Sequence, residues 1–265
     1  MMKNLSILFF IVSFLISCEK SDSPFKNDPN YPTTFDKINS NLLSQIRTDY
    51  YQKNKYLITS LTQFGFCGSM EENRVADTPP LLNSLTQTEA IQLVRNFVAV
   101  NPGYTGVKNP DDLMFANISS TSLYQDGSIS WSIRSTNQKI DSLEVLNSEI
   151  VFTIKRRELI ICSGNWFPNI YVPAKANFSQ DKAKSLLLNK VVSHLTFGSQ
   201  KYDVTISSAD LNKSTIRLVV IPINTGDRIE LRLAWHFNIP GPVYYQMCID
   251  IMTGEIIDQQ PTIIS

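Results

Sequence analysis

Residues 250–257, with the sequence DIMTGEII, place apolar residues on both sides of one glycine-containing corner. Asp250 can accept hydrogen bonds from the turn amides, and Gly254 can adopt the positive φ that a three-residue or bulged hairpin needs. The stretch therefore predicts a β-hairpin whose corner is a turn and not a place of chemistry. Residues 153–160, TIKRRELI, align with it without a gap. Arg157 stands where the glycine should be, so we expect that turn to differ or to be strained.

Two predicted helix starts, each preceding one of these hairpins in the sequence, also resemble each other. Thr86 and Glu89 form a capping box, and apolar residues follow at helical spacing until Asn101 and Pro102 end the helix. Ser179 is expected to cap a second helix, whose apolar face consists of Ala183, Leu186, Leu187 and Val191. Strand-like sequences follow each helix, around Trp131 and Trp235, and the loops between these landmarks differ in length. This order favours a duplicated unit over a chance succession of helix and strands.

The predicted fold class is α+β, with two helix-on-antiparallel-sheet units in tandem. We assign residues 85–165 to the first unit and residues 166–265 to the second. Residues 35–84 form an N-terminal helical or irregular segment, in which apolar residues at helical intervals predict a helix over 35–50.

The N-terminus has the features of an export signal. Lys3 precedes an apolar run at residues 5–16, LSILFFIVSFLI, which is too short to span a bilayer comfortably. The following Leu-Ile-Ser-Cys resembles the lipobox of bacterial lipoproteins, and the alternative is an ordinary signal peptide that contains a cysteine. The resemblance implies a signal peptide over residues 1–17, a lipid on Cys18, and a flexible tether over residues 18–34. We therefore expect a lipid-anchored protein of the bacterial cell envelope, in the outer membrane and either periplasmic or surface-exposed.

Composition limits the partners and the redox chemistry. The 265 residues contain 24 Lys and Arg against 24 Asp and Glu, so the chain has no basic excess with which to bind nucleic acid. Besides Cys18 there are three cysteines, and an odd number in an oxidising compartment leaves at least one thiol free. Cys162 and Cys248 lie in strand-like apolar runs, so buried free thiols are the expectation. One disulfide among Cys67, Cys162 and Cys248 is the alternative, and the sequence does not choose its ends.

No familiar catalytic pattern occurs in the sequence. The two histidines are His194, predicted to close the second helix, and His236, predicted on a strand, and neither has a metal-site spacing around it. A Gly-x-Ser-x-Gly elbow and glycine-rich phosphate loops are missing, and the stretch Phe66-Cys67-Gly68-Ser69-Met70 only partly resembles a cysteine-protease motif. We therefore expect no enzyme activity, no metal site and no cofactor.

Four segments resemble the propeptides of thermolysin- and fungalysin-type proteases, whose closing half is the cystatin-like PepSY domain. They are residues 159–169 (LIICSGNWFPN), the helix that opens with Ser179 and runs to Leu187, residues 232–235 (RLAW) and the hairpin at 250–255. The likeness covers about residues 85–260. Two departures matter: residues 139–145 lack the usual glycine and proline, and no zinc protease follows the propeptide-like part. The resemblance implies a module that inhibits a protease or assists its folding.

The expected function is the binding of another protein, for example a metalloprotease, by the PepSY-like module. One alternative is a small-molecule or glycan site in an aromatic groove formed by Trp166, Phe167 and Tyr171, although packing between the units is favoured for these rings. Another alternative is a structural subunit of a surface assembly. The basic run at residues 155–157 is interpreted as a solvated hairpin end in preference to a binding tip.

Overall fold

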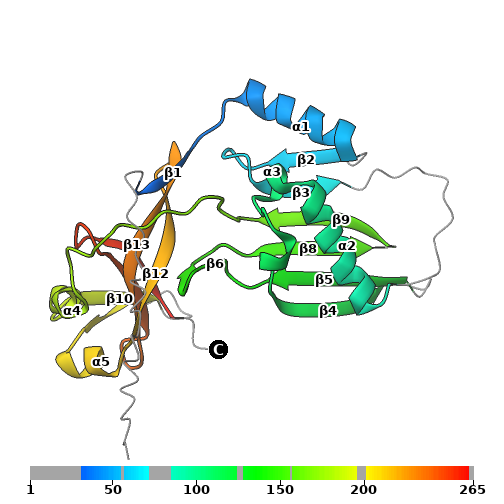
Figure 1. Ribbon diagram of the computed structural model, residues 1–265. Helices are drawn as coiled ribbons and strands as arrows, with labels where there is room; N and C mark the ends of the chain where they lie inside the picture. The colour runs from blue at the N-terminus through cyan, green and yellow to red at the C-terminus, as the bar shows by residue number, and fades with distance from the viewer. Residues whose placement is uncertain are drawn as a thin grey trace, which may run out of the picture.

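The computed structural model describes residues 31–54, 57–71, 85–123, 128–155, 157–195 and 201–262. The predicted signal peptide, Cys18 and most of the predicted tether lie outside these ranges, as does Arg156. The described part has a mixed α+β fold with few helices, which agrees with the predicted class (Figure 1).

The first sheet has four antiparallel strands in the order β4-β5-β8-β9. These strands are β4 (Phe115–Leu123), β5 (Ser128–Ser135), β8 (Ile150–Lys155) and β9 (Glu158–Gly164). Helix α2 (Gln87–Val100) lies across this sheet (Figure 1), and its buried side chains share one hydrophobic core with those of β5 and β8. Two short helices, α3 (Pro102–Thr105) and η1 (Pro110–Asp112), connect α2 to β4.

Helix α2 begins at the predicted capping box. The backbone N–H of Glu89 donates to Thr86 Oγ1 at 3.3 Å, and the Glu89 carboxylate accepts from the Thr86 backbone N–H at 2.7 Å. The predicted apolar face is also confirmed, because the helix buries Ala90, Val94, Phe97 and Val98.

Replacing Thr86 with alanine is expected to lower the free energy of unfolding by about 1 kcal/mol, because a hydrogen bond to the first helical turn is lost. The matched control is Thr88, an exposed residue in the first turn of the helix, two positions after Thr86. Thr88→Ala should be neutral or slightly stabilising, since alanine has the higher helix propensity. Urea denaturation of both variants measures the difference, and equal midpoints would contradict the capping role.

The N-terminal segment consists of β1 (Thr33–Asp36), α1 (Ser40–Asn54), β2 (Leu57–Leu61) and β3 (Cys67–Glu71). The helix predicted over residues 35–50 therefore begins later than expected. Phe35 lies in β1, which pairs with β13 of the second sheet, and Asn39 caps the helix by accepting from the Leu42 N–H at 2.9 Å. The apolar residues from Phe35 onward thus belong to two elements: β1 packs against the second core, and α1 packs against the first.

The second sheet is larger, and its main path runs in the order β15-β14-β13-β12-β7-β6, with β1 added to β13. Its bounds are β6 (Lys139–Ile140), β7 (Leu143–Val145), β12 (Thr215–Asn224), β13 (Arg228–Ile239), β14 (Tyr245–Asp250) and β15 (Ile256–Pro261). Because β7 pairs parallel with β12, the sheet is mixed and not purely antiparallel as predicted. The segment at 139–145 crosses from the first sheet to the second because Leu143 and Val145 are buried in the second core.

Helices α4 (Gln180–Leu187) and α5 (Ser208–Lys213) cover one face of the second sheet. The hairpin of β10 (Val191–Leu195) and β11 (Lys201–Thr205) joins them there. In Figure 1 these elements lie on the side of the sheet that faces away from the first sheet.

The second predicted helix is shorter than expected. Ser179 caps it as predicted, but Leu188 is extended and Asn189 has a φ of 64°, so the helix ends at Leu187. Val191 and His194 lie on strand β10 and not on the helix, which corrects the prediction for both residues. The β-branched pair Val191 and Val192 favours the strand.

The hairpin turn at Asp250 has the predicted mechanism. The Asp250 carboxylate accepts from the backbone N–H groups of Met252 and Thr253 at 2.6 and 3.0 Å, and Gly254 has a φ of 76°. Arg157 takes a φ of 68° in the corresponding turn of the first sheet. A side chain is rarely found in this region of backbone space, which agrees with the expectation of strain.

Two tryptophans make equivalent hydrogen bonds in the two halves of the chain. Trp131 on β5 donates its indole N–H to the carbonyl of Leu85, which directly precedes the cap of α2, at 3.0 Å. Trp235 on β13 donates to the carbonyl of Phe178, which directly precedes the cap of α4, at 2.9 Å. In each half, a strand indole thus fixes the start of the helix.

Candidate functional site

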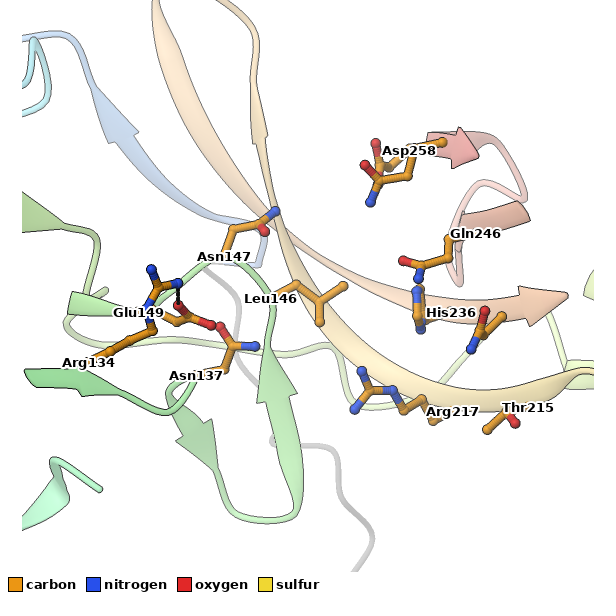
Figure 2. Close-up of a pocket in the computed structure, with 12 residues that line it drawn as sticks. Arg134, Asn137, Leu146, Asn147, Glu149, Thr215, Arg217, His236, Gln246 and Asp258 are labelled. Atoms are coloured by element: carbon orange, nitrogen blue, oxygen red, sulfur yellow. Dashed lines mark hydrogen bonds and ion pairs between the residues drawn. The ribbon is translucent and has the colours of Figure 1, made fainter. Parts of the chain in front are cut away.

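A cavity of about 840 Å³ lies between the two sheets (Figure 2). One wall comes from the first sheet and from the segment that follows β7: Arg134, Asn137, Leu146, Asn147 and Glu149. The other wall is the face of the second sheet that α4 and α5 leave uncovered: Thr215, Arg217, His236, Asn238, Gln246, Asp258 and Gln260.

Strand register explains why these polar side chains share a face. Side chains two residues apart on a strand point to the same side of a sheet. One row across the second sheet therefore holds four polar residues opposite one another: Thr215, Asn238, Gln246 and Gln260. The next row holds Arg217, His236, Cys248 and Asp258. The other face of the same strands is apolar, since it packs against α4 and α5.

An apolar contact holds the segment that follows β7 against the second sheet, beside the cavity. Val219, Ala234 and Cys248 are buried on the same face as the polar rows, and Leu146 packs against them. The Leu146 backbone N–H also donates to the carbonyl of Val220 at 2.8 Å. This contact fixes the position of Leu146, which lines the cavity.

Ion pairs hold the charged side chains at the cavity. Arg217 pairs with Glu144, which also accepts from the Asn137 side-chain amide at 2.6 Å, and Arg134 pairs with Glu149 at 2.9 Å. Burial alone would raise the pKa of Glu144, but the hydrogen bond from Asn137 and the nearby Arg217 outweigh it and lower that pKa. Glu144 thus stays ionised and orients Arg217.

His236 lies on the cavity wall, between Arg217 and Asp258 in their row across the second sheet. Burial lowers the pKa of this imidazole below its ordinary value, and the neighbouring positive charge of Arg217 lowers it further. A hydrogen bond with Gln246 and the charges of Asp258 and Glu144 act in the opposite direction. Figure 2 shows Gln246 beside the imidazole. The neutral imidazole is therefore favoured at neutral pH, where it can both donate and accept a hydrogen bond.

The lowered pKa of His236 makes stability depend on pH. Because the unfolded chain binds this proton more readily, the contribution is present above the ordinary histidine value of about 6.5 and is lost as the pH falls through the folded-state pKa. We expect the wild-type melting temperature to fall between pH 7.5 and pH 5, and to fall less in His236→Gln. Thermal unfolding at both pH values measures this, and identical slopes for the two proteins would contradict it.

Several polar side chains on the cavity wall have no side-chain hydrogen bond within the described residues. Thr215, Asn238 and Gln260 belong to this group, and all three are exposed. An amide side chain has both donors and an acceptor, and a hydroxyl group has both functions as well. The arrangement can therefore bind a ligand that itself alternates donors and acceptors.

The three residues predicted to form an aromatic groove are not brought together. Trp166 is 5% exposed and belongs to the first core, whereas Phe167 is fully buried in the second core. Tyr171 is half-buried and lines a different surface hollow, next to Thr33. Phe167 instead packs against Phe35 in a tilted arrangement and against Phe66 edge-to-face, with ring centroids 5.5 and 5.3 Å away.

The two histidines lie on opposite sides of the second sheet. His194 on β10 stacks on Tyr202 at 5.0 Å between ring centroids, among the elements that cover the apolar face. Within the described ranges, no three His, Cys, Asp or Glu residues are grouped so that they could hold a metal ion. No helix in the same part of the chain is both long and apolar enough to cross a membrane.

The cavity residues were not identified from the sequence, apart from His236, which was considered only as a metal ligand. One signal was available: His236 and Asn238 alternate with apolar residues on a predicted strand, which marks a polar face. The partners on β12, β14 and β15 could not be found in this way because their register is set by non-local pairing.

Comparisons with known proteins add little. No family model matches the sequence, and no curated protein matches it. Among solved structures, the chain is similar to the C-terminal domain of YpeB from Bacillus megaterium, with 12% identity and a TM-score of 0.34 over 86% of this chain and 100% of that one. A likeness at this level supports no conclusion about family or function.

Proposed function

We propose that this chain is a non-catalytic, lipid-anchored protein of the bacterial cell envelope that binds another protein at the cavity between its sheets. The lipid predicted on Cys18 provides the anchor, and the predicted tether at residues 18–34 separates the anchor from the fold. The observation that carries the proposal is the row of polar side chains on the helix-free face of the second sheet, of which Thr215, Asn238 and Gln260 are exposed.

The proposal includes two PepSY-like units, α2 with the first sheet and α4 with the second. The equivalent indole hydrogen bonds of Trp131 and Trp235 support a duplication, because each fixes the residue before a helix cap. The loops between the matched helices and strands differ in length in the two units, as expected after a duplication, because surface loops tolerate insertions. The second unit supplies most of the cavity wall, so the binding function is assigned to it.

The cavity chemistry suits a polypeptide better than an anionic ligand. Two arginines and two carboxylates line it, Arg134 and Arg217 with Glu149 and Asp258, so no excess of positive charge is present. Asn238 and Gln260 can each donate to a main-chain carbonyl and accept from a main-chain N–H.

Strand β15 gives an extended segment a place to bind. It pairs with β14 on one side and is the outer strand of the sheet path. A partner segment that adds to this edge would gain main-chain hydrogen bonds, and its side chains could reach the cavity beside Asp258 and Gln260.

The partner class follows from the resemblance to protease propeptides. We propose a secreted metalloprotease of the same cells, which this chain inhibits or helps to fold. In this proposal, the chain does for a separate protease what a covalently attached propeptide does for its own enzyme.

The test is an inhibition assay with the purified chain and a secreted metalloprotease from the same organism. Asn238→Ala combined with Gln260→Ala should raise the inhibition constant about tenfold, which corresponds to the loss of two hydrogen bonds of roughly 0.7 kcal/mol each. The matched control combines Asn212→Ala with Gln180→Ala, both exposed on the helices that cover the other face.

The control variant should inhibit as the wild type does. Equal inhibition by the two double variants would exclude the cavity as the contact surface. Failure of the wild-type chain both to inhibit and to form any cross-link with an envelope protein would overturn the proposed function as a whole.

A further inference from the structure

Two of the three described thiols lie against each other. Cys67 begins β3 and Cys162 lies in β9, and their exposed fractions are 1% and 0% within the first core. A side-chain hydrogen bond joins them, and the Cys67 thiol also donates to the carbonyl of Gly164 at 3.5 Å. Figure 1 shows β3 beside β9.

We propose that Cys67 and Cys162 form a disulfide bond when the exported chain meets an oxidising disulfide. The bond would join the N-terminal segment, through β3, to the edge of the first sheet at β9. This goes beyond the proposed binding function and involves neither the cavity nor a partner.

The packing of the β2–β3 hairpin explains how an oxidant could reach buried thiols. Among the described residues, β2 and β3 pair by backbone hydrogen bonds only with each other. The hairpin meets β9 through side chains of the first core. Because the hairpin, as far as the structure describes it, shares no backbone hydrogen bonds with the four-stranded sheet, local opening at this contact would expose both thiols while that sheet stays folded.

Exchange requires the open hairpin. Burial raises the pKa of the Cys162 thiol while the hairpin is closed, and its hydrogen bond with Cys67 raises that pKa further. Cys67 lies on the hairpin that opens, so we place it as the first nucleophile. The Cys67 thiolate attacks one sulfur of the oxidant disulfide, and the other sulfur leaves as a thiolate and takes up a proton. The Cys162 thiolate then attacks Cys67 Sγ and displaces the second oxidant thiol. One oxidant disulfide is reduced to two thiols, and the two cysteines lose two electrons and two protons.

Cys248 is separated from this pair by its place in the fold. It lies on β14 of the second sheet, in the small apolar cluster beside the cavity, and is 1% exposed. Burial raises its pKa to about 12. Cys248 should therefore stay reduced, and it provides a matched control.

The test uses the full chain in mild detergent with Cys18→Ser, so that only the three described thiols remain. After incubation with oxidised glutathione, the free thiols in denaturant should fall from three to one. Trypsin places the cysteines on separate peptides, 56–74, 158–175 and 233–265. Mass spectrometry without reductant should find the first two linked.

Oxidation should also raise the melting temperature by roughly 5–10 °C, as expected for a disulfide that closes a long loop. Cys67→Ser and Cys162→Ser should abolish this shift, whereas Cys248→Ser should retain it. Three free thiols after prolonged oxidation, or a linkage that includes the 233–265 peptide, would overturn the proposal. Peptide mapping uses the chain that retains all three thiols, so it identifies the linked cysteines even if a Cys→Ser variant folds poorly.

Discussion

Replacing Asp250 with alanine is expected to lower the free energy of unfolding by about 3 kcal/mol, because a fully buried carboxylate with three partners is lost. One oxygen accepts from the backbone N–H groups of Met252 and Thr253, and the other accepts from Arg232 at 3.2 Å. Alanine leaves the turn amides without their acceptor. Among the described residues, it also leaves Arg232 with Glu230 as its ion-pair partner. Chemical denaturation at neutral pH measures the loss.

Asp250→Asn separates the two contributions. Its side-chain carbonyl can still accept from the turn amides, while the ion pair with Arg232 is removed. We expect this variant to lose about half as much stability as the alanine variant. A loss below about 1 kcal/mol for Asp250→Ala would show that the turn does not depend on this carboxylate.

Alanine at Gly164 is the second substitution with a large expected effect. Gly164 has a φ of 140°, and an added Cβ would lie 2.0 Å from the backbone oxygen of Glu149 and 2.9 Å from the Cα of Ile150. Because both obstacles are backbone atoms, the pairing of β8 with β9 must shift to relieve them. We expect a loss of about 4 kcal/mol or more, measured by thermal and urea unfolding.

Gly226→Ala is the matched control for backbone strain without a clash. Gly226 also has a positive φ, 94°, but an added Cβ would meet no atom within 4 Å. This variant should lose about 1–2 kcal/mol. Similar losses for the two alanine variants would contradict the view that close backbone contact, and not φ alone, requires glycine at residue 164.

The sequence predicted the features that local interactions determine. The capping box at Thr86 and the turn between Asp250 and Gly254 each depend on residues a few positions apart, and both occur as expected. The start of α4 at Ser179 was predicted for the same reason, but its end was not. Asn189 in the left-handed region stops that helix, whereas the apolar spacing predicted that it continues through Val191 to His194.

Non-local pairing accounts for what the sequence could not predict. The transfer of residues 139–145 to the second sheet depends on burial of Leu143 and Val145 in a core formed by distant strands. Likewise, Arg217, His236 and Asp258 become neighbours only through the register of β12 to β15. The candidate site was therefore outside the reach of sequence patterns, although the alternation around His236 marked one strand of it.

The approach of the two cysteines is a further example of such long-range order. Cys67 and Cys162 are far apart in the sequence and show no motif spacing, which left the choice of disulfide ends open. Packing of β3 against β9 selects this pair and separates Cys248 from it.

Site-specific photo-cross-linking in the native cells tests the central claim most directly. A benzophenone side chain at position 238 would lie on the cavity wall, and the same group at position 212 would lie on α5, which covers the opposite face. The proposal predicts one discrete adduct with a secreted metalloprotease from position 238 and none from position 212. An adduct only from position 212, or none from either position, would contradict binding at the cavity.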